Sequence, residues 1–546
     1  MIRPTSPGPT GAIDCSASEV VVVGGGPVGL AMTLELGRRG VDVLMVDAGD
    51  GVVSYPTAES IDVRTMEWLR SAGCGDAVDD SGFPVDYARD ISFTATLAGP
   101  ELVRFARPSN AERRATTGGL SAEGAAWWPK FWFDSALRER AEALSSVTLR
   151  YQWRCADFAQ DASGVTLTLV RDEEVRQVRA QFVVACDGGQ STLRRACGIG
   201  MSGSAREARW QGAMVEIPGL LDALPLDPAV QYYLLAPRRL ILGSLDGGDF
   251  WRVTYPLRDG ETSGESQAMS AVRDALGGLD LPVVLHGARG WSGNSVVAER
   301  FRDGRVFLAG DAAHQMWPSG GHGMNTGIGD VQNLGWKLEA ALRGRAGPAL
   351  LDSYELERRP VAERNVRRAA SNYAADIALP SGPELLGEDA AAQALRRTAA
   401  ELVRDTRATE WASLGIQLGF RYSGSAILPG TATPEPADDP GDYVPVVRVG
   451  HRAPHVQLAD GRALIDALGT GFTVLRARAD ASAEEWTRAF KLRGYDLEIV
   501  DVPATEEYAT MTVCLVRPDG VVCWEEHCTT TGPGDVASIV LGHEAA

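Results

Sequence analysis

The residues best suited to chemistry in this sequence are glycines and acids grouped in three short turns. The first turn reads Gly24-Gly25-Gly26-Pro27-Val28-Gly29. Gly24 permits a tight turn, Gly26 lets the backbone approach a pyrophosphate, and Gly29 lets a helix pack closely on a strand. Asp47 follows at the distance expected for a carboxylate that binds the hydroxyls of an adenine ribose. The turn predicts a bound dinucleotide, although this pattern alone does not separate FAD from NAD.

The other two turns extend the predicted dinucleotide site. Asp187-Gly188, in the segment from Cys186 to Arg194, leaves an apolar run and enters a predicted helix. Gly310-Asp311 also follows an apolar run, which places Asp311 to bind the hydroxyls of a ribityl chain. Residues 318–325 lead into a helix whose N-terminal amides would stabilise negative charge on a reduced flavin ring. Three such turns, in this order, predict one extended FAD molecule.

The elements around these turns predict an α/β fold with a doubly wound sheet. Residues 19–23 and 41–46 are apolar runs on either side of a helical segment at 28–40, which is the opening β-α-β unit of such a sheet. Residues 214–256 are rich in β-branched and aromatic residues and predict an antiparallel sheet. The sequence thus predicts a Rossmann-like FAD-binding domain with an inserted antiparallel β-sheet substrate domain. Further strands are expected at 165–170, 178–185 and 305–309, and further helices at 323–343 and 351–373.

A change in composition marks a separate C-terminal unit. Residues 429–445 are dense in Pro, Gly, Asp and Thr and predict a linker. From residue 450 the chain has its own predicted strands, with a hairpin turn at Arg517-Pro518-Asp519-Gly520. The expected domains are a disordered tail (1–18), an FAD-binding domain (19–90, 110–200 and 296–375), a substrate-binding domain (91–109 and 201–295), a helical segment (376–428), a linker (429–449) and a C-terminal domain (450–546).

Composition restricts the compartment and the partners. The formal net charge of -19 argues against nucleic acid and anionic membranes as partners. None of the eight cysteines forms a C-x-x-C pair, so we expect a reducing, cytoplasmic location without a disulfide framework. No apolar stretch approaches the ~20 residues that cross a bilayer, and the first residues lack a signal-peptide pattern. The seven histidines have no metal-ligand spacing, so we expect no metal. We expect the protein to be a monomer or a homodimer.

Longer motifs give the sequence a resemblance to a known family. Besides the three turns, these motifs are Gly320-Gly321-His322-Gly323-Met324-Asn325-Thr326-Gly327, Asn333-Leu334-Gly335-Trp336-Lys337-Leu338, and Tyr354 followed by Glu357-Arg358-Arg359-Pro360. On these motifs the chain resembles the single-component (class A) FAD-dependent aromatic hydroxylases of the para-hydroxybenzoate hydroxylase and phenol hydroxylase type. It is especially similar to the actinomycete branch that acts on polyketides and indolocarbazoles, the rebeccamycin type included. The block from Gly450-His451-Arg452-Ala453-Pro454 resembles the thioredoxin-like domain of the phenol hydroxylase branch. Without a C-x-x-C pair this domain would be structural.

The resemblance implies a reaction. The chain would be an FAD-dependent monooxygenase of secondary metabolism that uses NAD(P)H and O2 to hydroxylate a planar phenolic, polyketide or indole-derived substrate through a flavin C4a-hydroperoxide. NAD(P)H would bind transiently, because the sequence has one dinucleotide fingerprint. Baeyer–Villiger or other oxidative ring chemistry on the same fold stays open as an alternative, and so does a non-catalytic flavoprotein. The sequence lacks the Trp-x-Trp-x-Ile-Pro segment of a flavin halogenase.

Three positions depart from the residues usual in this family. Asp47-Ala48-Gly49 stands where relatives often have a Glu followed by an Arg, and Thr57 stands where many carry an arginine. Lys130 lies nearest to the place of a glutamine that relatives set against the flavin. These changes leave FAD binding expected and bear on how the isoalloxazine ring is held.

The candidate site residues follow from the motifs and the resemblance. Aromatic side chains with few polar groups suit a planar substrate. His322 is a candidate base for a phenol, with a structural role as the alternative. Arg239 is a candidate partner for a carboxylate or phenolate, with a solvated Arg238-Arg239 pair as the alternative. The expected FAD contacts are Gly24, Gly26, Pro27, Val28, Gly29, Asp47, Ala48, Lys130, Asp187, Arg194, Gly310, Asp311, Pro318, Gly321, Gly323, Met324 and Asn325. The expected substrate contacts are Tyr232, Arg239, Trp251, Trp291 and Trp317.

Overall fold

A largely parallel sheet positions the three glycine turns. In the computed structural model, which describes residues 6–55, 57–431, 433–478, 483–528 and 532–544, its strand order is β18-β19-β10-β1-β2-β7. Strands β19, β10, β1, β2 and β7 are parallel neighbours, so the turns after β1, β10 and β19 leave the same edge of the sheet. The strands are β1 (Ala17–Val23), β2 (Val43–Asp47), β7 (Val147–Tyr151), β10 (Glu174–Ala185), β18 (Arg302–Asp303) and β19 (Val306–Leu308). An antiparallel hairpin of β8 (Arg154–Asp161) and β9 (Gly164–Arg171) extends β10.

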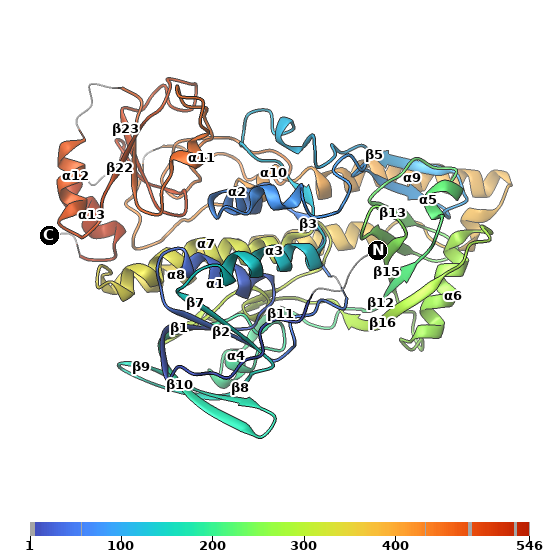
Figure 1. Cartoon of the computed structure of the whole chain (residues 1–546). Helices are drawn as coiled ribbons and strands as arrows, with labels where there is room; N and C mark the ends of the chain where they lie inside the picture. Colours follow the sequence, from blue (N-terminus) through green and yellow to red (C-terminus); the bar gives the residue numbers. More distant parts are fainter. Residues whose placement is uncertain (1–5, 56, 432, 479–482, 529–531, 545–546) are drawn as a thin grey trace.

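Apolar runs explain why this sheet lies in the interior. Val20–Val23 of β1 are buried, as expected for a parallel strand covered on both faces. Helix α1 (Pro27–Gly37) packs between α3 (Lys130–Glu142) and α7 (His322–Leu342), and α7 also packs on α8 (Pro348–Ile377). Helices α7 and α8 cross the middle of the molecule (Figure 1). The short helix α4 (Thr192–Ala196) packs near β8.

The N-terminal segment differs from the sequence-based expectation. The Gly8 amide donates to the Asp50 carbonyl at 2.8 Å, and the Trp153 indole donates to the Gly11 carbonyl at 3.2 Å. Ile13 is buried in the core of the sheet, and β1 already begins at Ala17. The prediction of a disordered tail over 1–18 is therefore wrong from residue 8 onward, because these contacts order the segment. Residues 1–5 lie outside the described residues.

A second, mainly antiparallel sheet forms the inserted unit. Its strand order is β16-β12-β15-β14-β13-β4-β5, with β13 and β4 as the parallel pair. Helix α6 (Glu265–Leu276) packs on one face of it, and α9 (Ala390–Trp411) packs beside β5. A three-stranded sheet consists of β11 (Met201–Ser204), which precedes β12, β17 (Ser295–Ala298), which follows β16, and β20 (His314–Gln315), which follows β19. The strands of the second sheet are β4 (Ile91–Thr94), β5 (Glu101–Phe105), β12 (Arg209–Glu216), β13 (Gln231–Leu234), β14 (Leu240–Ser244), β15 (Phe250–Pro256) and β16 (Val284–Ser292).

The C-terminal unit has its own four-stranded sheet. Its order is β22-β21-β23-β24, in which β21 and β22 are parallel and the other pairs antiparallel. Residues 517–520 turn between β23 and β24, with Gly520 at φ +75. Before this sheet, Tyr443 packs with Val63 and Leu418, whereas Val447 and Val449 are buried with side chains of the C-terminal unit. The elements are β21 (Thr473–Arg476), α12 (Glu484–Lys491), β22 (Glu498–Asp501), β23 (Val513–Val516), β24 (Val522–Glu525) and α13 (Pro533–Val540).

All eight cysteines are free thiols that are buried or half-buried. Burial is the main cause that raises the pKa of each of them. Among the helices of the described ranges, none has the length and apolar character to traverse a bilayer.

Candidate active site

The first glycine turn brings β1, β10 and α1 together without side chains between them. Gly24 has φ +112, and a Cβ there would clash with the Cys186 carbonyl oxygen at the end of β10. A Cβ at Gly29 would clash with the Gly24 carbonyl oxygen. Glycine is therefore required at both positions by the protein itself, independently of any ligand.

The start of α1 is different, because it faces open space. Gly26 is the N-cap residue and Pro27 the first helical residue, and a Cβ on Gly26 would meet nothing within 4 Å. The unpaired amides of a helix N-terminus bind phosphate groups. Val28 does not line this space with its side chain, which packs into the notch formed by Gly310 and Gly327. The arrangement fits a pyrophosphate above Gly26.

Asp47 ends β2 beside this turn. Its carboxylate accepts hydrogen bonds from the Gly25 amide and the Gly49 amide, both at 2.6 Å. Ala48 is exposed next to it. The acid that the sequence assigns to the adenine ribose thus lies at the sheet edge, next to the start of α1.

The second turn offers an oxygen without a partner. One carboxylate oxygen of Asp187 caps α4 by accepting from the Thr192 amide at 2.7 Å, while the other is buried and has no hydrogen bond to any residue that the structure describes. Arg194 donates to the carbonyls of Gly189 at 3.3 Å and Ala312 at 3.2 Å, so its guanidinium connects the second turn to the third. A buried carboxylate oxygen without a partner fits a ligand hydroxyl.

The third turn presents an acid to solvent. Asp311 is exposed between the buried residues Gly310 and Ala312, and within the described ranges its carboxylate has no hydrogen-bond partner. Gly310 is fixed from behind, since its amide donates to Asp330 at 3.1 Å. With Gly26 and Asp187, Asp311 completes an edge whose donors and acceptors fit an extended dinucleotide.

The N-terminus of α7 follows the third turn, and the sequence predicts that it faces a flavin ring. Gly321 caps α7 with φ +69, behind the exposed Pro318, and Gly323 and Met324 are half-buried in the first turn. Asn325 donates to the Ser60 carbonyl at 3.0 Å and accepts from the Asp62 amide at 3.1 Å. The Asn325 side chain is therefore hydrogen-bonded to the backbone of residues 60 and 62 and does not point into free space.

Lys130, the predicted neighbour of the flavin, has an ion-pair partner on its own helix. It begins α3, and its ammonium is ion-paired with Asp134 one turn later. Burial raises the pKa of Asp134, and Lys130 opposes that shift. The backbone amide of Lys130 donates to the Ala58 carbonyl at 2.8 Å, which keeps the start of α3 beside residues 58–61.

The pleat of the second sheet decides which side chains can meet a substrate. One face carries Trp210, Gly212, Arg252, Thr254 and Trp291, which the strand register places on the same side. We call this the site face, because it contacts Tyr55 and Glu59 of the unit that carries the three glycine turns. There Arg252 pairs with both carboxylate oxygens of Glu59, at 2.5 and 3.0 Å, and a Cβ on Gly212 would clash with the Tyr55 hydroxyl.

Two predicted substrate contacts lie on the opposite face. Tyr232 and Trp251 belong to the apolar core beneath α6, and the Tyr232 hydroxyl is used by the backbone at residues 227 and 229. Both assignments are wrong because side chains alternate along a strand. Arg239 is also corrected: it is buried, pairs with Asp376 at 3.1 Å and donates to the Leu379 carbonyl at 2.8 Å, which fixes α8 to the sheet.

Trp291 and Trp317 lie in one aromatic cluster, and their contact with a substrate stays a prediction. Trp291 stacks on Trp210 with ring centroids 5.4 Å apart, and Trp317 stacks on Tyr373 with centroids 3.5 Å apart. A Cβ on Gly293 would clash with the Trp317 ring, so glycine is required there. Trp317 is fully buried and Trp291 half-buried, so Trp291 is the one with a free edge.

Tyr55, Glu59 and Arg252 are site-face residues that the motif analysis missed. Arg252 follows Trp251 in the same strand, and neighbouring side chains in a strand point to opposite faces. Strand alternation could therefore have placed Arg252 on the site face. Nothing local signals Tyr55 or Glu59, which reach the sheet from almost 200 positions away. Burial raises the pKa of the Tyr55 phenol to about 12.

The two histidines near the third turn are held in structural positions. His314 is fully buried and its Nε2 lies 2.8 Å from Asp330. Burial, followed by the charges of Arg368 and Arg364, lowers the pKa of His322 to about 4. His322 is thus neutral at physiological pH, and it lines a crevice between α7 and α8. This position favours the structural alternative over a base that deprotonates a phenol.

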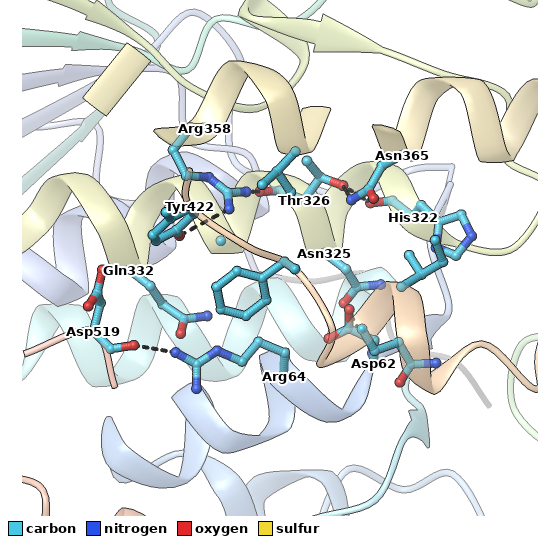
Figure 2. A pocket seen from close by; sticks show the side chains of 15 residues that line it. Asp62, Arg64, His322, Asn325, Thr326, Gln332, Arg358, Asn365, Tyr422 and Asp519 are labelled. Atoms are coloured by element: carbon cyan, nitrogen blue, oxygen red, sulfur yellow. Dashed lines mark hydrogen bonds between the residues drawn. The ribbon is translucent and has the colours of Figure 1, made fainter. Parts of the chain in front are cut away.

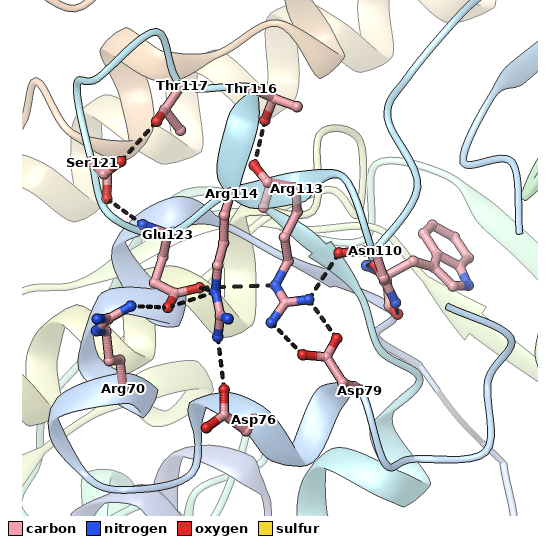
Figure 3. Close-up of polar contacts among 12 residues, drawn as sticks. Arg70, Asp76, Asp79, Asn110, Arg113, Arg114, Thr116, Thr117, Ser121 and Glu123 are labelled. Atoms are coloured by element: carbon pink, nitrogen blue, oxygen red, sulfur yellow. Dashed lines mark hydrogen bonds and ion pairs between the residues drawn. The ribbon is translucent and has the colours of Figure 1, made fainter. Parts of the chain in front are cut away.

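A dense group of charges next to α2 (Val63–Ser71) is an ion-pair network. Arg113 and Arg114 pair with Asp79 and Asp76, and Glu123 joins Arg114 to Arg70 (Figure 3). Its acids are satisfied by arginines. Throughout the described ranges, no three His, Cys, Asp or Glu side chains are grouped as a metal ion would require.

Comparison with known proteins now identifies the family. Residues 17–369 match the family described as "FAD binding domain", and residues 447–543 match "Aromatic-ring hydroxylase, C-terminal". The chain belongs to the FAD-dependent aromatic-ring hydroxylases. It is an FAD-dependent monooxygenase, and the resemblance drawn from its motifs is confirmed.

Similar proteins span the whole chain. The chain is 32% identical to 4-methyl-5-nitrocatechol 5-monooxygenase from Burkholderia sp., over 94% of this chain and 95% of that one. It is 31% identical to aklavinone 12-hydroxylase RdmE from Streptomyces purpurascens, over 96% and 97% of the two chains. The solved structure of RebC with bound 7-carboxy-K252c superposes with a TM-score of 0.89 at 34% identity, covering 97% of this hydroxylase and all of that chain (100%).

Proposed function

We propose that this hydroxylase oxygenates a planar, polycyclic aromatic compound of polyketide or indole-derived type, with NAD(P)H as reductant and O2 as oxygen source. Relatives named for aklavinone and tetracenomycin, and RebC with 7-carboxy-K252c, support this substrate class. The observation that carries the proposal is the site face. It joins the aromatic pair Trp210–Trp291 to the carboxyl edge of the parallel sheet through Trp317, six residues after Asp311.

The residues of this chain would divide the work. FAD, when bound, supplies the activation of oxygen. The amides at the start of α1 would bind its pyrophosphate, and Asp187 and Asp311 its hydroxyls. The N-terminus of α7 would stabilise negative charge on the ring. Trp291 would stack on the substrate, while the buried Trp317, stacked on the half-buried Tyr373, would exclude water from one side.

The C-terminal unit is proposed to be a thioredoxin-like domain with a structural role. Its strand order, one parallel pair followed by two antiparallel pairs, with α12 between the parallel strands and α13 at the end, supports this assignment. Cys514 and Cys523 are buried free thiols on adjacent strands, and burial raises the pKa of both, which is opposite to a dithiol catalyst. The free thiols also support a cytoplasmic location.

Turnover with a panel of aromatics tests the proposal. Purified holoenzyme would be mixed with NADPH or NADH in air, with phenol, 2-naphthol, a hydroxyanthraquinone or an indolocarbazole as effector. We expect the polycyclic compounds to accelerate oxidation of the reduced nicotinamide and to yield a product one oxygen atom heavier by mass spectrometry. Acceleration by phenol alone would overturn the proposed substrate class, and oxidation without an oxygenated product from any compound would overturn the proposed reaction.

A further inference from the structure

The C-terminal domain contacts helix α2 through buried ion pairs. Arg452, at the start of that domain, donates from Nε to Glu67 of α2 at 3.0 Å, and its Nη2 pairs with the other carboxylate oxygen. Arg64, one turn earlier on α2, pairs with Glu67 at 2.9 Å and donates to the Asp519 carbonyl of the C-terminal hairpin. The side chains of Glu67 and Arg452 are 1% and 5% exposed, so this contact is excluded from water.

A second buried network fixes the same hairpin to α7 and α8. Arg517 donates to both carboxylate oxygens of Glu357, at 2.8 and 2.9 Å, and Lys337 pairs with Glu357 at 2.8 Å. All three side chains are fully buried. The C-terminal domain therefore has a fixed position on α7 and α8, from which it can hold α2.

The other end of α2 is tied to the flavin end of α7. Asp62 caps α2 by accepting from the Thr65 amide at 2.7 Å, and its own amide donates to Asn325. Asn325 also donates to the Ser60 carbonyl and, at 2.7 Å, to the Gly321 carbonyl. The start of α2 and the first turn of α7 thus share one side chain.

Between these two ends, a crevice with polar and apolar side chains lies beside α2 and α7. It is lined from α2, α7, α8, residues 416–422 and the C-terminal hairpin (Figure 2). Gln332 Nε2 and Asn365 Oδ1 are buried there and have no hydrogen-bond partner in the described part of the chain, which suits ordered water. Apolar side chains of α2 and α7 belong to one buried core cluster, and the polar contacts at the two ends of α2 add to that packing.

From these contacts we propose that Arg452 and Glu67 are positioning residues: through α2 and Asn325, the C-terminal domain sets the position of the first turn of α7. This rests on the proposed function in one respect, that this turn faces the flavin ring. The domain would then affect the active site through the position of α7, although none of its residues touches the reacting atoms.

Hydrogen exchange and flavin potential of the holoenzyme test this proposal. Arg452→Gln leaves Glu67 with Arg64 and with Ser121, whose hydroxyl donates to it at 2.6 Å, so the carboxylate keeps partners. The matched control is Asp466→Asn, which removes another ion pair between the same domain and the same helix, Arg70–Asp466 at 2.6 Å, at the last turn of α2. The readouts are amide exchange by mass spectrometry, the flavin midpoint potential, and kcat and KM for NADPH.

We expect Arg452→Gln to raise exchange about tenfold in two regions, residues 60–66 and 322–327, and to make the flavin potential more negative. Loss of a helix N-terminus from a reduced, anionic ring corresponds to about a tenfold change in the reduction equilibrium. Arg452→Lys should restore part of both effects, and Asp466→Asn should produce neither. Increased exchange confined to residues 448–454 and 517–522, with an unchanged potential, would overturn the proposal.

Two further arms keep the result interpretable. If Arg452→Gln does not fold, Arg452→Lys carries the test, and exchange at 322–327 equal to that of the unaltered enzyme would refute the proposal. The exchange readout needs no turnover. A protein that fails to oxygenate any aromatic but shows the paired exchange changes would therefore refute the proposed function and leave the positioning role supported.

Discussion

The carboxylate of Asp330 in α7 accepts a hydrogen bond from the Gly310 amide at 3.1 Å, which fixes the third cofactor turn to the middle of that helix. The same carboxylate binds His314 at 2.8 Å and pairs with Arg358 of α8 at 2.9 Å. Although burial favours its protonated form, His314 and Arg358 hold the pKa of Asp330 below its usual range. One buried acid thus joins a binding turn to two helices.

Replacing this acid should loosen the cofactor. Asp330→Asn leaves Arg358 buried without its counter-charge, and breaking a buried pair in this way costs about 3 to 5 kcal/mol. We expect a lower free energy of unfolding and a lower FAD-to-protein ratio after purification, measured by urea unfolding and by absorbance. A variant that retains full FAD at unchanged stability would contradict this role of Asp330.

The first glycine turn offers a pair of alanine variants with opposite expectations. A Cβ at Gly29 collides with the Gly24 carbonyl, whereas a Cβ at Gly26 meets nothing within 4 Å, and Gly26 has φ -75, which alanine adopts freely. Gly29→Ala should destabilise the apoprotein. Gly26→Ala should leave its melting temperature unchanged but weaken FAD binding at least tenfold, as titrated by fluorescence quenching. Equal FAD affinity in Gly26→Ala and the unaltered protein would show that the pyrophosphate lies elsewhere.

The neutral His322 should make stability depend on pH. Its pKa falls from 6.5 to about 4 on folding, so between these values the unfolded chain binds more protons than the folded one. The stability it contributes is complete above about pH 6.5 and is lost as the pH falls toward 4. We expect His322→Gln to flatten the fall of the unfolding free energy between pH 7.5 and pH 5 by about 2 kcal/mol. Unchanged slopes in urea unfolding would disprove this.

Glu410 provides a comparison of opposite sign. Burial raises its pKa to about 7 and Arg407 opposes the shift, so the folded protein binds more protons than the unfolded chain between about pH 4.5 and 7. Its contribution is lost as the pH rises through this window. Glu410→Gln should therefore steepen the same pH profile that His322→Gln flattens. Shifts of the same sign in the two variants would contradict the assignment.

The two faces of the second sheet should respond differently to truncation. Trp251→Ala removes a fully buried ring beneath α6 and should cost about 3 to 5 kcal/mol of stability. Trp291→Ala removes a half-buried ring of the site face and should raise KM for the aromatic substrate about three- to tenfold, leaving KM for NADPH unchanged. Steady-state kinetics combined with thermal unfolding distinguish the two effects. A rise in aromatic KM in Trp251→Ala alone would reverse the assignment of faces.

The sequence allowed the cofactor edge to be predicted because its determinants are local. Gly24, Asp187 and Gly310 each follow an apolar strand within a few residues, so spacing alone reveals them. The substrate side was predicted less well. The prediction for Tyr232 and Trp251 rests on residue type, whereas the face of the sheet on which a side chain lies depends on strand register. A shift of one residue in the register moves the side chain to the opposite face.

Long-range partners explain the remaining differences. Arg239 pairs with Asp376 and donates to the Leu379 carbonyl, both about 140 positions away. The segment before β1 has a disorder-like composition, yet the Asp50 carbonyl and the Trp153 indole order it. No local pattern contains these contacts, since each depends on where the sheet brings a distant residue.

The protonated state of the sulfur atoms has a consequence for durability. Reduced flavin and dioxygen together generate peroxide, and peroxide attacks thiolates far faster than thiols. All eight thiols are buried or half-buried, and burial raises the pKa of each. They therefore stay protonated at neutral pH. The polypeptide is thereby shielded from an oxidant that its own prosthetic group can release.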